Sequence, residues 1–280
     1  VKHVDMLPLE EKWVITISSQ YGSSMGCNFC DVPKVGPGKN ATVRDLVGQI
    51  LAARELHPEV KNTDRLNIHF ARMGEPTFNF NVLHVAQRLS VVGNELLSLD
   101  TKTIHPVVST MLPKNNKLLS VFLHDWMSIK NNDYKGEAGL QFSINSTCES
   151  EREVMFSGDA LTLSEIGKLS QKLPDPVGRK ITLNFAVANY EIDPNVLLRH
   201  FDPRNYIVKL TPMHMTTAAL KNNIMTSGDY TSYYPYKYYE ESLRNAGYDV
   251  LVFIASKEED EGRITCGNAV LSGTRPFDLD

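Results

Sequence analysis

The feature that most constrains the fold is a regular alternation, from Trp13 onward, of β-rich apolar runs with amphipathic segments. Seven apolar runs are expected to be strands, and segments with helical periodicity lie between them. The strand candidates are residues 13–20, 66–73, 103–110, 139–146, 180–188, 206–213 and 249–256. The helix candidates are residues 42–57, 80–89, 114–125, 161–173, 193–201 and 235–247. Repeated β–α units with continuous apolar strands predict a parallel sheet that is buried on both faces.

About six such units predict an α/β fold, a full or partial (β/α)6 barrel. Functional groups in barrels come from the carboxyl ends of the strands. The composition, 42% hydrophobic and 22% charged, is typical of a globular chain. Because no internal repeat or low-complexity linker is visible, we predict one domain over residues 1–280. Residues 1–12 would form an N-terminal extension, and residues 257–280 a C-terminal segment that carries Cys266.

Local signals mark two helix starts. Thr42, with Asp45 three residues later, is typical of an N-cap. The segment "YTSYYPYKYYEE", between Tyr230 and Glu241, could be a platform on which nucleic-acid bases stack. It could also be the start of a helix, with Pro235 near the first helical position and several tyrosines packed on the barrel. The helix start is the favoured interpretation.

The net charge and the lengths of the apolar runs limit the classes of partner that the chain can have. The net charge of −4 gives no global attraction for nucleic acid, so RNA contacts would need a local patch. Basic residues are scattered, as at Lys34, Lys39 and Lys114. No apolar run near 18 residues and no signal peptide are visible, so we expect a cytoplasmic protein with no membrane partner. Disulfides are not expected among the four cysteines.

One stretch, "QYGSSMGCNFC" (20–30), contains a Cys-x-x-Cys pair, Cys27 and Cys30, on either side of Phe29. In a cytosolic protein this spacing is typical of metal binding or redox chemistry. Zinc usually takes four ligands, and no second pair of suitable spacing is present. The serine at position 23 stands where a third cysteine would complete C-x3-C-x2-C. Taken alone, the pair leaves structural, redox and metal-binding roles open.

Further polar motifs follow the other predicted strands, and a barrel would gather them at one rim. They are "MGEP" (73–76), "ST" (109–110), "SINST" (143–147), "TPMH" (211–214) and "TCGN" (265–268). Each has an ordinary alternative. Gly74 could allow a close backbone approach and Pro76 could end a strand, and the serines could be loop residues. Cys266 could be an inert small hydrophobe and His214 a rim histidine.

In this order, however, the motifs resemble the radical S-adenosylmethionine methyltransferases that methylate C2 or C8 of adenine in RNA, the RlmN/Cfr family. The resemblance extends from about Val4 to Gly273. "SSQYGSSMGCNFCDVPKVGPGKNATVRDLVGQI" is similar to that family's cluster loop and following helix, and "MGEPTFNFNVL" to its signature after the second strand. The resemblance implies a radical S-adenosylmethionine barrel.

The same resemblance implies a [4Fe–4S] cluster and S-adenosylmethionine as cofactors. Three thiolates hold such a cluster and leave one iron open to the amino and carboxylate groups of S-adenosylmethionine, which one electron then cleaves. The implied cluster ligands are Cys27, Cys30 and, at the third position, Ser23, with Phe29 shielding the cluster. The implied S-adenosylmethionine contacts are Gly74 and Glu75 for the amino group, Ser109, Ser143 and Asn145 for the carboxylate and ribose, and His214 for the adenosine.

Cys266 matches the family's cysteine that carries a methyl group in transit, and is therefore the implied catalytic residue. A carrier is needed because an unreactive aromatic carbon cannot be methylated by simple displacement. The implied substrate is RNA, either ribosomal or transfer RNA. A reductant such as flavodoxin or ferredoxin would supply the electron.

Three positions depart from the family pattern. Ser23 replaces a cluster cysteine, and a hydroxyl binds iron less readily than a thiol. Thr16 stands where the family has its second catalytic cysteine. His3 stands where a family glutamate lies near the substrate, and could act as a base. The family's N-terminal RNA-binding domain is also expected to be absent.

These departures leave an alternative from another class. The chain could be a catalytically impaired or non-catalytic relative that binds S-adenosylmethionine, RNA or a partner protein. Retention of Cys27, Cys30, Glu75 and Cys266 favours the enzyme. Cys148, after "SINST", is expected to be structural.

Overall fold

The computed structural model describes residues 7–273, so the expectation for His3 lies outside the described residues. Within this range seven parallel strands form one sheet, in which neighbours follow the order of the chain. They are β1 (Trp13–Ile17), β4 (Asn62–Phe70), β5 (Asp100–Thr110), β6 (Gly139–Ser143), β7 (Ile181–Val187), β8 (Tyr206–Pro212) and β9 (Asp249–Val252). Each overlaps a predicted strand, so the seven strands are confirmed, although several of their bounds differ from those predicted.

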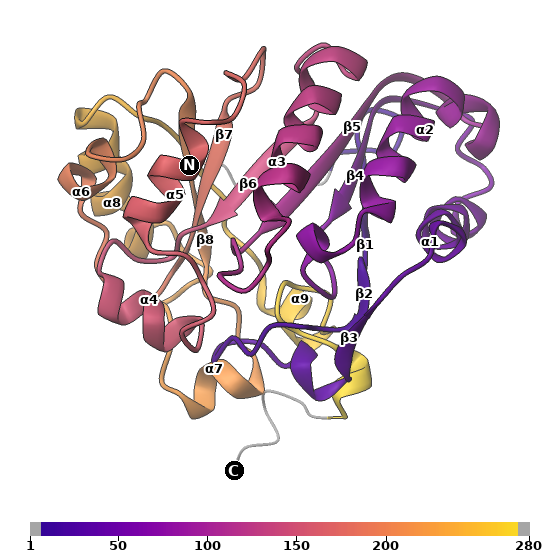
Figure 1. Ribbon diagram of the computed structural model, residues 1–280. Coiled ribbons are helices and arrows are strands. Elements are labelled where there is room, and N and C mark those ends of the chain that lie inside the picture. The colour runs from indigo at the N-terminus through magenta and orange to yellow at the C-terminus, as the bar shows by residue number, and fades with distance from the viewer. Residues whose placement is uncertain (1–6, 274–280) are drawn as a thin grey trace.

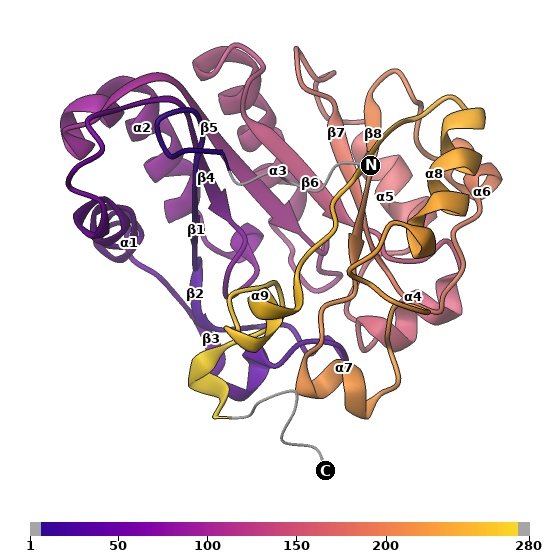
Figure 2. The same ribbon diagram turned by 180° about the vertical axis from the view of Figure 1, so that it is seen from behind.

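The sheet curves into a partial barrel with helices on its outer face (Figures 1 and 2). The helices are α1 (Val43–Leu56), α2 (Asn81–Leu97), α3 (Leu119–Ser128), α4 (Glu149–Met155), α5 (Leu163–Ser170), α6 (Pro194–Leu198), α7 (Thr217–Lys221), α8 (Tyr234–Asn245) and α9 (Lys257–Glu261). The prediction missed α4, α7 and α9, which have seven, five and five residues, whereas the equally short α6 was predicted. A π-helix, η3 (Ile129–Asp133), follows α3. No helix in the described range is long and apolar enough to cross a membrane.

Alternation along the strands separates the two faces of the sheet. Leu66, Ile68 and Phe70 of β4 belong to the core between the sheet and the outer helices. Because side chains alternate along a strand, Arg65 and His69 lie on the opposite, inner face. We call this inner face, with the side chains that it carries, the barrel lumen. It is open to solvent at β1, where the side chain of Val14 is 45% exposed.

The predicted helix starts are confirmed. Thr42 caps α1 and exchanges hydrogen bonds with Asp45 in a capping box. Pro235 occupies the first turn of α8. Tyr236 is fully buried and donates its hydroxyl to the Tyr230 carbonyl, at 2.8 Å. The tyrosine-rich segment is thus the packed start of a helix.

The boundary before "MGEP" was predicted wrongly. Strand β4 ends at Phe70, and Pro76 instead begins a 3-10 turn, η2 (Pro76–Phe78). The structure also contains a short antiparallel pair that was not predicted, β2 (Gln20–Gly22) with β3 (Pro37–Asn40). Their glycine-rich sequences lack an apolar alternation. The pair encloses the segment that carries both cysteines of the Cys-x-x-Cys motif.

Candidate functional site

The Cys27–Cys30 loop lies at the carboxyl end of the barrel, near α7 and α9 (Figure 1). The amide of Cys30 donates to the Cys27 carbonyl, at 3.2 Å, which closes the turn. Cys27 and Phe29 pack against a cluster of buried residues with four methionines. These are Met25, Met111, Met155 and Met213. Since Met111 follows β5 and Met213 follows β8, the loop sits over the ends of these strands.

The two thiols of the loop are poorly solvated. Burial raises the pKa of Cys27 well above its usual range, and the charges of Cys30, Glu75 and Cys266 raise it further. Burial also raises the pKa of Cys30 to about 12, with a further contribution from Cys266. Cys30 Sγ has a long contact, 3.8 Å, with the carbonyl of Gly267. Both sulfur atoms are therefore largely desolvated, and thiolates are ligands that soft cations prefer.

Ser23, the third predicted ligand position, lies on the same loop. Its Oγ accepts a hydrogen bond from the amide of Met25, at 3.1 Å, and its own amide donates to Gly36 O. Among residues 7–273, no three His, Cys, Asp or Glu side chains gather closely enough to hold a metal ion. The residues therefore fit an iron–sulfur cluster in part, with two thiols and, at the third position, a hydroxyl.

The segment that carries Cys266 is docked against this loop. The amide of Asp31 donates to Gly267 O at 2.8 Å, and a Cβ on Gly267 would lie 3.7 Å from Cys30 Cα. Arg72, which follows β4, donates to the carbonyls of Thr265, at 2.6 Å, and Arg263. Cys266 is an exposed residue, yet desolvation raises the pKa of its thiol, which the charges of Arg72 and Lys209 oppose.

Asp31 connects three segments and was missed by the sequence analysis. Its fully buried carboxylate accepts hydrogen bonds from the amides of Thr217, at 2.8 Å, and Ala218, at 3.0 Å, where α7 begins. Its Oδ2 lies 3.5 Å from Nη2 of Arg263, and its Oδ1 lies 2.8 Å from Nζ of Lys34. Its position directly after Cys30 was the signal in the sequence that could have identified it.

Gly74 and Glu75 lie in the turn after β4. Gly74 has a φ of 90°, and a Cβ there would lie 2.4 Å from Gln20 Cβ, so the predicted close approach is confirmed. The Glu75 carboxylate is buried and accepts from the amides of Thr77, at 3.1 Å, and Met111, at 3.0 Å. Burial raises the pKa of Glu75, and these hydrogen bonds oppose the rise.

The predicted contacts Ser109, Ser143 and Asn145 come from two neighbouring strands. Ser109 ends β5 with Thr110, and Ser143 is the last residue of β6; both are half-buried on the inner face. Asn145 is buried in the left-handed conformation, with φ of 62°, and its Oδ1 accepts from the Ala186 amide at 2.9 Å. The three residues therefore line one side of the same rim.

His214 lies after β8 and is paired with the C-terminal segment. Its Nδ1 is 3.0 Å from Oδ1 of Asp260, which is fully buried in α9. Burial raises the pKa of Asp260, but His214, Thr265 and the amide of Met215 lower it by more, so the net shift is downward. The carboxylate thus fixes both His214 and the segment that leads to Cys266.

Thr16 lies on the inner face of β1 and is exposed, in register with His69 of β4. Burial lowers the pKa of His69 to about 3, and the charges of Lys209, Arg179, Lys12 and Arg65 lower it further. At neutral pH His69 is therefore an uncharged imidazole beside cations.

Acid is expected to destabilise the fold through His69. Between about pH 3 and 6.5 the unfolded chain binds a proton that folded His69 excludes, so stability falls as the pH drops below 6.5. This contributes at most about 1.4 kcal/mol per pH unit. The free energy of unfolding, measured by urea denaturation between pH 4 and 7, should depend less steeply on pH in His69→Gln than in the parent. His124→Gln, at an exposed site, is the control, and an equal slope in both variants would contradict the assignment.

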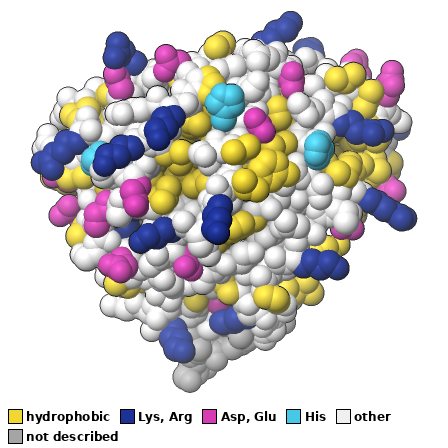
Figure 3. Space-filling view, viewed as in Figure 1, with side chains coloured by type: hydrophobic (Ala, Val, Ile, Leu, Met, Phe, Trp, Pro, Cys, Tyr) yellow, Lys and Arg dark blue, Asp and Glu magenta, His cyan; other side chains and the backbone are white. Residues whose placement is uncertain are grey.

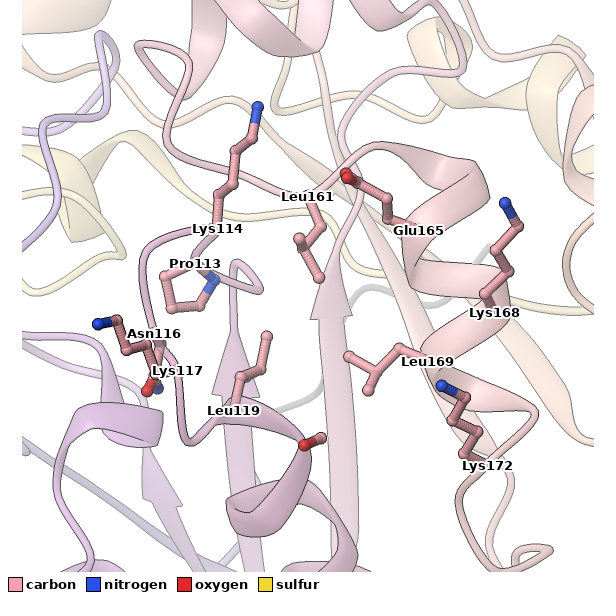
Figure 4. Close-up of a pocket in the computed structure, with 11 residues that line it drawn as sticks. Pro113, Lys114, Asn116, Lys117, Leu119, Leu161, Glu165, Lys168, Leu169 and Lys172 are labelled. Atoms are coloured by element: carbon pink, nitrogen blue, oxygen red, sulfur yellow. The ribbon is translucent and has the colours of Figure 1, made fainter.

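A pocket of about 300 Å³ lies on the outer side between α3 and α5 (Figure 4). It is bordered by Lys114, Lys168 and Lys172, with Glu165 beside them, and contains none of the predicted site residues. On this outer face, Lys and Arg side chains are interspersed with acidic and apolar ones (Figure 3). The face shown therefore has no continuous basic patch.

No family model matches the chain. The dual-specificity RNA methyltransferase RlmN of Sorangium cellulosum is 23% identical over 268 residues, which cover 93% of this chain and 62% of that protein. RlmN of Wolinella succinogenes is 37% identical over 109 residues, 39% of this chain and 30% of that protein. The chain therefore spans less than two thirds of the length of these relatives. The predicted sequence resemblance to this group is confirmed.

The fold is similar to that of Streptococcus suis SuiB. The crystal structure of SuiB bound to precursor peptide SuiA has a TM-score of 0.56 and 13% identity, and covers 90% of this chain and 51% of SuiB. SuiB bound to S-adenosylmethionine has a TM-score of 0.55 and 11% identity, and covers 90% of this chain and 52% of SuiB. The prediction of an α/β fold with a full or partial barrel is confirmed, and the barrel is partial.

Proposed function

We propose that the chain is a radical S-adenosylmethionine enzyme of the RNA adenine methyltransferase type. The observation that carries the proposal is the docking of the Cys266 segment on the Cys27–Cys30 loop, through the 2.8 Å hydrogen bond from Asp31 to Gly267. This contact joins the loop of Cys27 and Cys30 to the segment of Cys266 at one rim. Sequence similarity to proteins named RNA methyltransferases supports the substrate class, and flavodoxin or ferredoxin is the proposed class of reductant.

In this proposal Cys27 and Cys30 hold a [4Fe–4S] cluster through thiolates, and Ser23 Oγ completes the ligand set. When bound, the cluster supplies the electron that cleaves S-adenosylmethionine. Gly74 and Glu75 bind the amino group of S-adenosylmethionine, and Phe29 excludes water from the cluster. Ser109, Ser143 and Asn145 bind its carboxylate and ribose, and His214, held by Asp260, contacts its adenosine.

Cys266 carries the methyl group in this proposal. Arg72 holds the backbone on either side of it, which fixes the thiol relative to the loop. The charges of Arg72 and Lys209 offset part of the desolvation that raises the pKa of Cys266, whose thiolate is the form that must attack a methyl donor. Thr16, which has no thiol, cannot resolve a methyl-linked adduct by forming a disulfide.

Anaerobic reconstitution with iron and sulfide tests the proposal. The expected result is bound iron with an EPR signal that shifts when S-adenosylmethionine is added. Cys27→Ser should abolish the signal, whereas Cys148→Ser, at the start of α4, should retain it. Methyl-labelled S-adenosylmethionine should then label the peptide that contains Cys266.

The alternative, a non-catalytic relative, is favoured by Ser23 and Thr16. It predicts iron no higher in the parent than in Cys27→Ser, in a folded protein that still binds S-adenosylmethionine. That outcome would reject the enzyme, and an unlabelled Cys266 beside an intact cluster would reject the carrier role.

A further inference from the structure

Four cations converge on the barrel lumen from separate parts of the chain. Lys12 precedes β1 and Arg65 lies on β4; their neighbours Trp13 and Leu66, which face the outer core, are paired in register. Lys209 lies on β8 between Val208 and Leu210, which also face the outer core. Alternation therefore directs Lys12, Arg65 and Lys209 inward.

Arg179, just before β7, reaches the lumen past a glycine. A Cβ on Gly139 would lie 3.3 Å from a guanidinium nitrogen of Arg179 and 3.0 Å from Val107 Cγ2. Val107 and Gly139 are paired in register on β5 and β6, at the level of His69. The missing side chain at position 139 thus makes room for a cation on the inner face. We call Lys12, Arg65, Arg179 and Lys209 the lumen cations.

The lumen cations form no ion pair with the described residues, and the carboxylate of Glu137 acts on Arg179 only as a nearby charge that opposes the lowering of its pKa by burial and by Arg65. None of them lies within 4.0 Å of a carboxylate of residues 7–273, where the ion pairs involve other side chains. Arg65 donates to Asn67 Oδ1, at 2.9 Å, and Arg179 to the carbonyl of Glu137, at 3.2 Å, and both acceptors are neutral. Lys209 Nζ lies 5.8 Å from the ring centroid of Phe253.

The cations also act on one another. Burial lowers the pKa of Lys12, and the charges of Arg65 and Arg179 lower it further. Burial likewise lowers the pKa of Lys209, opposed by Cys266, while Lys12 and Arg179 add to the lowering. Like charges gathered in a partly desolvated space are costly without an anion between them.

A neutral group beside the cations also lacks a partner. Asn184 Oδ1 is buried without a hydrogen bond from residues 7–273, and Asn184 is paired in register with Lys209. A phosphate monoester dianion satisfies the cations but offers no proton to this acceptor. A hydroxyl on the organic part of the ligand would offer one.

From this geometry we infer that the barrel lumen binds a sugar phosphate, either free or within a nucleotide. The phosphate lies among the lumen cations, where the guanidiniums of Arg65 and Arg179 suit its oxygens, and a sugar hydroxyl donates to Asn184. The inference does not rest on the proposed function, because none of these residues is a cluster ligand or the methyl carrier.

Calorimetric titration of the full chain, with and without a reconstituted cluster, tests the inference. The probes are ribose 5-phosphate, uridine 5′-monophosphate, ribose and inorganic phosphate at low salt. Ribose 5-phosphate is expected to bind at least tenfold more tightly than ribose or inorganic phosphate. Tighter binding of uridine 5′-monophosphate would identify the source as a nucleotide, and equal or weaker binding would identify a free sugar phosphate.

The variants Arg65→Gln, Arg179→Gln and Lys209→Met are each expected to weaken this binding at least tenfold. Lys168→Met and Lys172→Met remove charges from the outer pocket and should change the affinity for ribose 5-phosphate less than twofold. Thermal denaturation identifies any variant that fails to fold. Because the three lumen positions come from separate segments, a folding defect in one variant leaves the other two as tests. Ribose 5-phosphate that binds no better than ribose, or equal losses in lumen and outer variants, would overturn the inference. Because no lumen cation is a cluster ligand, failure to assemble the cluster should not change the binding of ribose 5-phosphate. Either proposal can therefore fail without the other.

Discussion

Replacing Asp31 with alanine is expected to lower the free energy of unfolding by about 3–5 kcal/mol. The carboxylate is fully buried, and its loss leaves the largely buried Arg263 without its anionic partner. The amides of Thr217 and Ala218 also lose their acceptor at the start of α7. Buried donors without acceptors add to the cost of the lost ion pair. Urea denaturation measures the change.

The same substitution should release the segment that carries Cys266. We expect Cys266 to react at least tenfold faster with a thiol reagent in Asp31→Ala, as measured by peptide mapping. Asp202→Ala is the control, because Asp202 pairs with Arg204 on the surface, where both side chains are exposed. It should leave the denaturation midpoint and Cys266 reactivity nearly unchanged. Equal behaviour of the two variants would refute the bridging role of Asp31.

Ser23→Cys is expected to raise bound iron to about four atoms per chain after anaerobic reconstitution. In the parent chain the third donor is a hydroxyl, so we expect occupancy well below this value. A thiolate at position 23 supplies the soft, acidic donor that the loop lacks. Iron and sulfide analysis measures the gain, and the EPR signal reports whether a four-iron cluster has formed.

The neighbouring residue provides a matched control for this experiment. Ser24 Oγ is directed toward the β2–β3 pair, where it contacts Gln20 and Gly38. A thiol at position 24 therefore points away from Cys27 and Cys30, and Ser24→Cys should not increase bound iron. An equal gain in both variants, or none in Ser23→Cys, would contradict the assignment of position 23 as a cluster ligand.

Much of the fold could be predicted because apolar periodicity is a local property. The seven strands are continuous apolar runs, and Thr42 and Pro235 mark helix starts through side chains a few residues away. The errors have the same cause. The β2–β3 pair is held by partners 15 to 20 residues apart and has no apolar face to show in the sequence. Helices α7 and α9 have five residues each, which is less than two turns.

Site residues that belong to short motifs could be predicted from the sequence. Contacts between segments that are far apart in the sequence could not. The spacing of Cys27 and Cys30 and the order of the later motifs were visible in the sequence. The contacts of Arg72 with residues 263 and 265 join segments almost 200 residues apart. The lumen cations likewise come from four separate segments, so only the barrel brings them together. Lys209 stands out only as a charge inside an apolar strand, and nothing in the local sequence distinguishes Arg179 from a surface cation.

The docking of the Cys266 segment also imposes an order on biosynthesis. Asp31 and Arg263 are 232 positions apart, so the cysteine loop leaves the ribosome long before its partner exists. The loop therefore lacks this support until residue 263 has been synthesised. A nascent chain that has passed residue 252 but not reached residue 263 already contains all seven strands of the sheet, yet its cysteine loop lacks the contact with Arg263. This rim is therefore completed only after the strands of the barrel have been made.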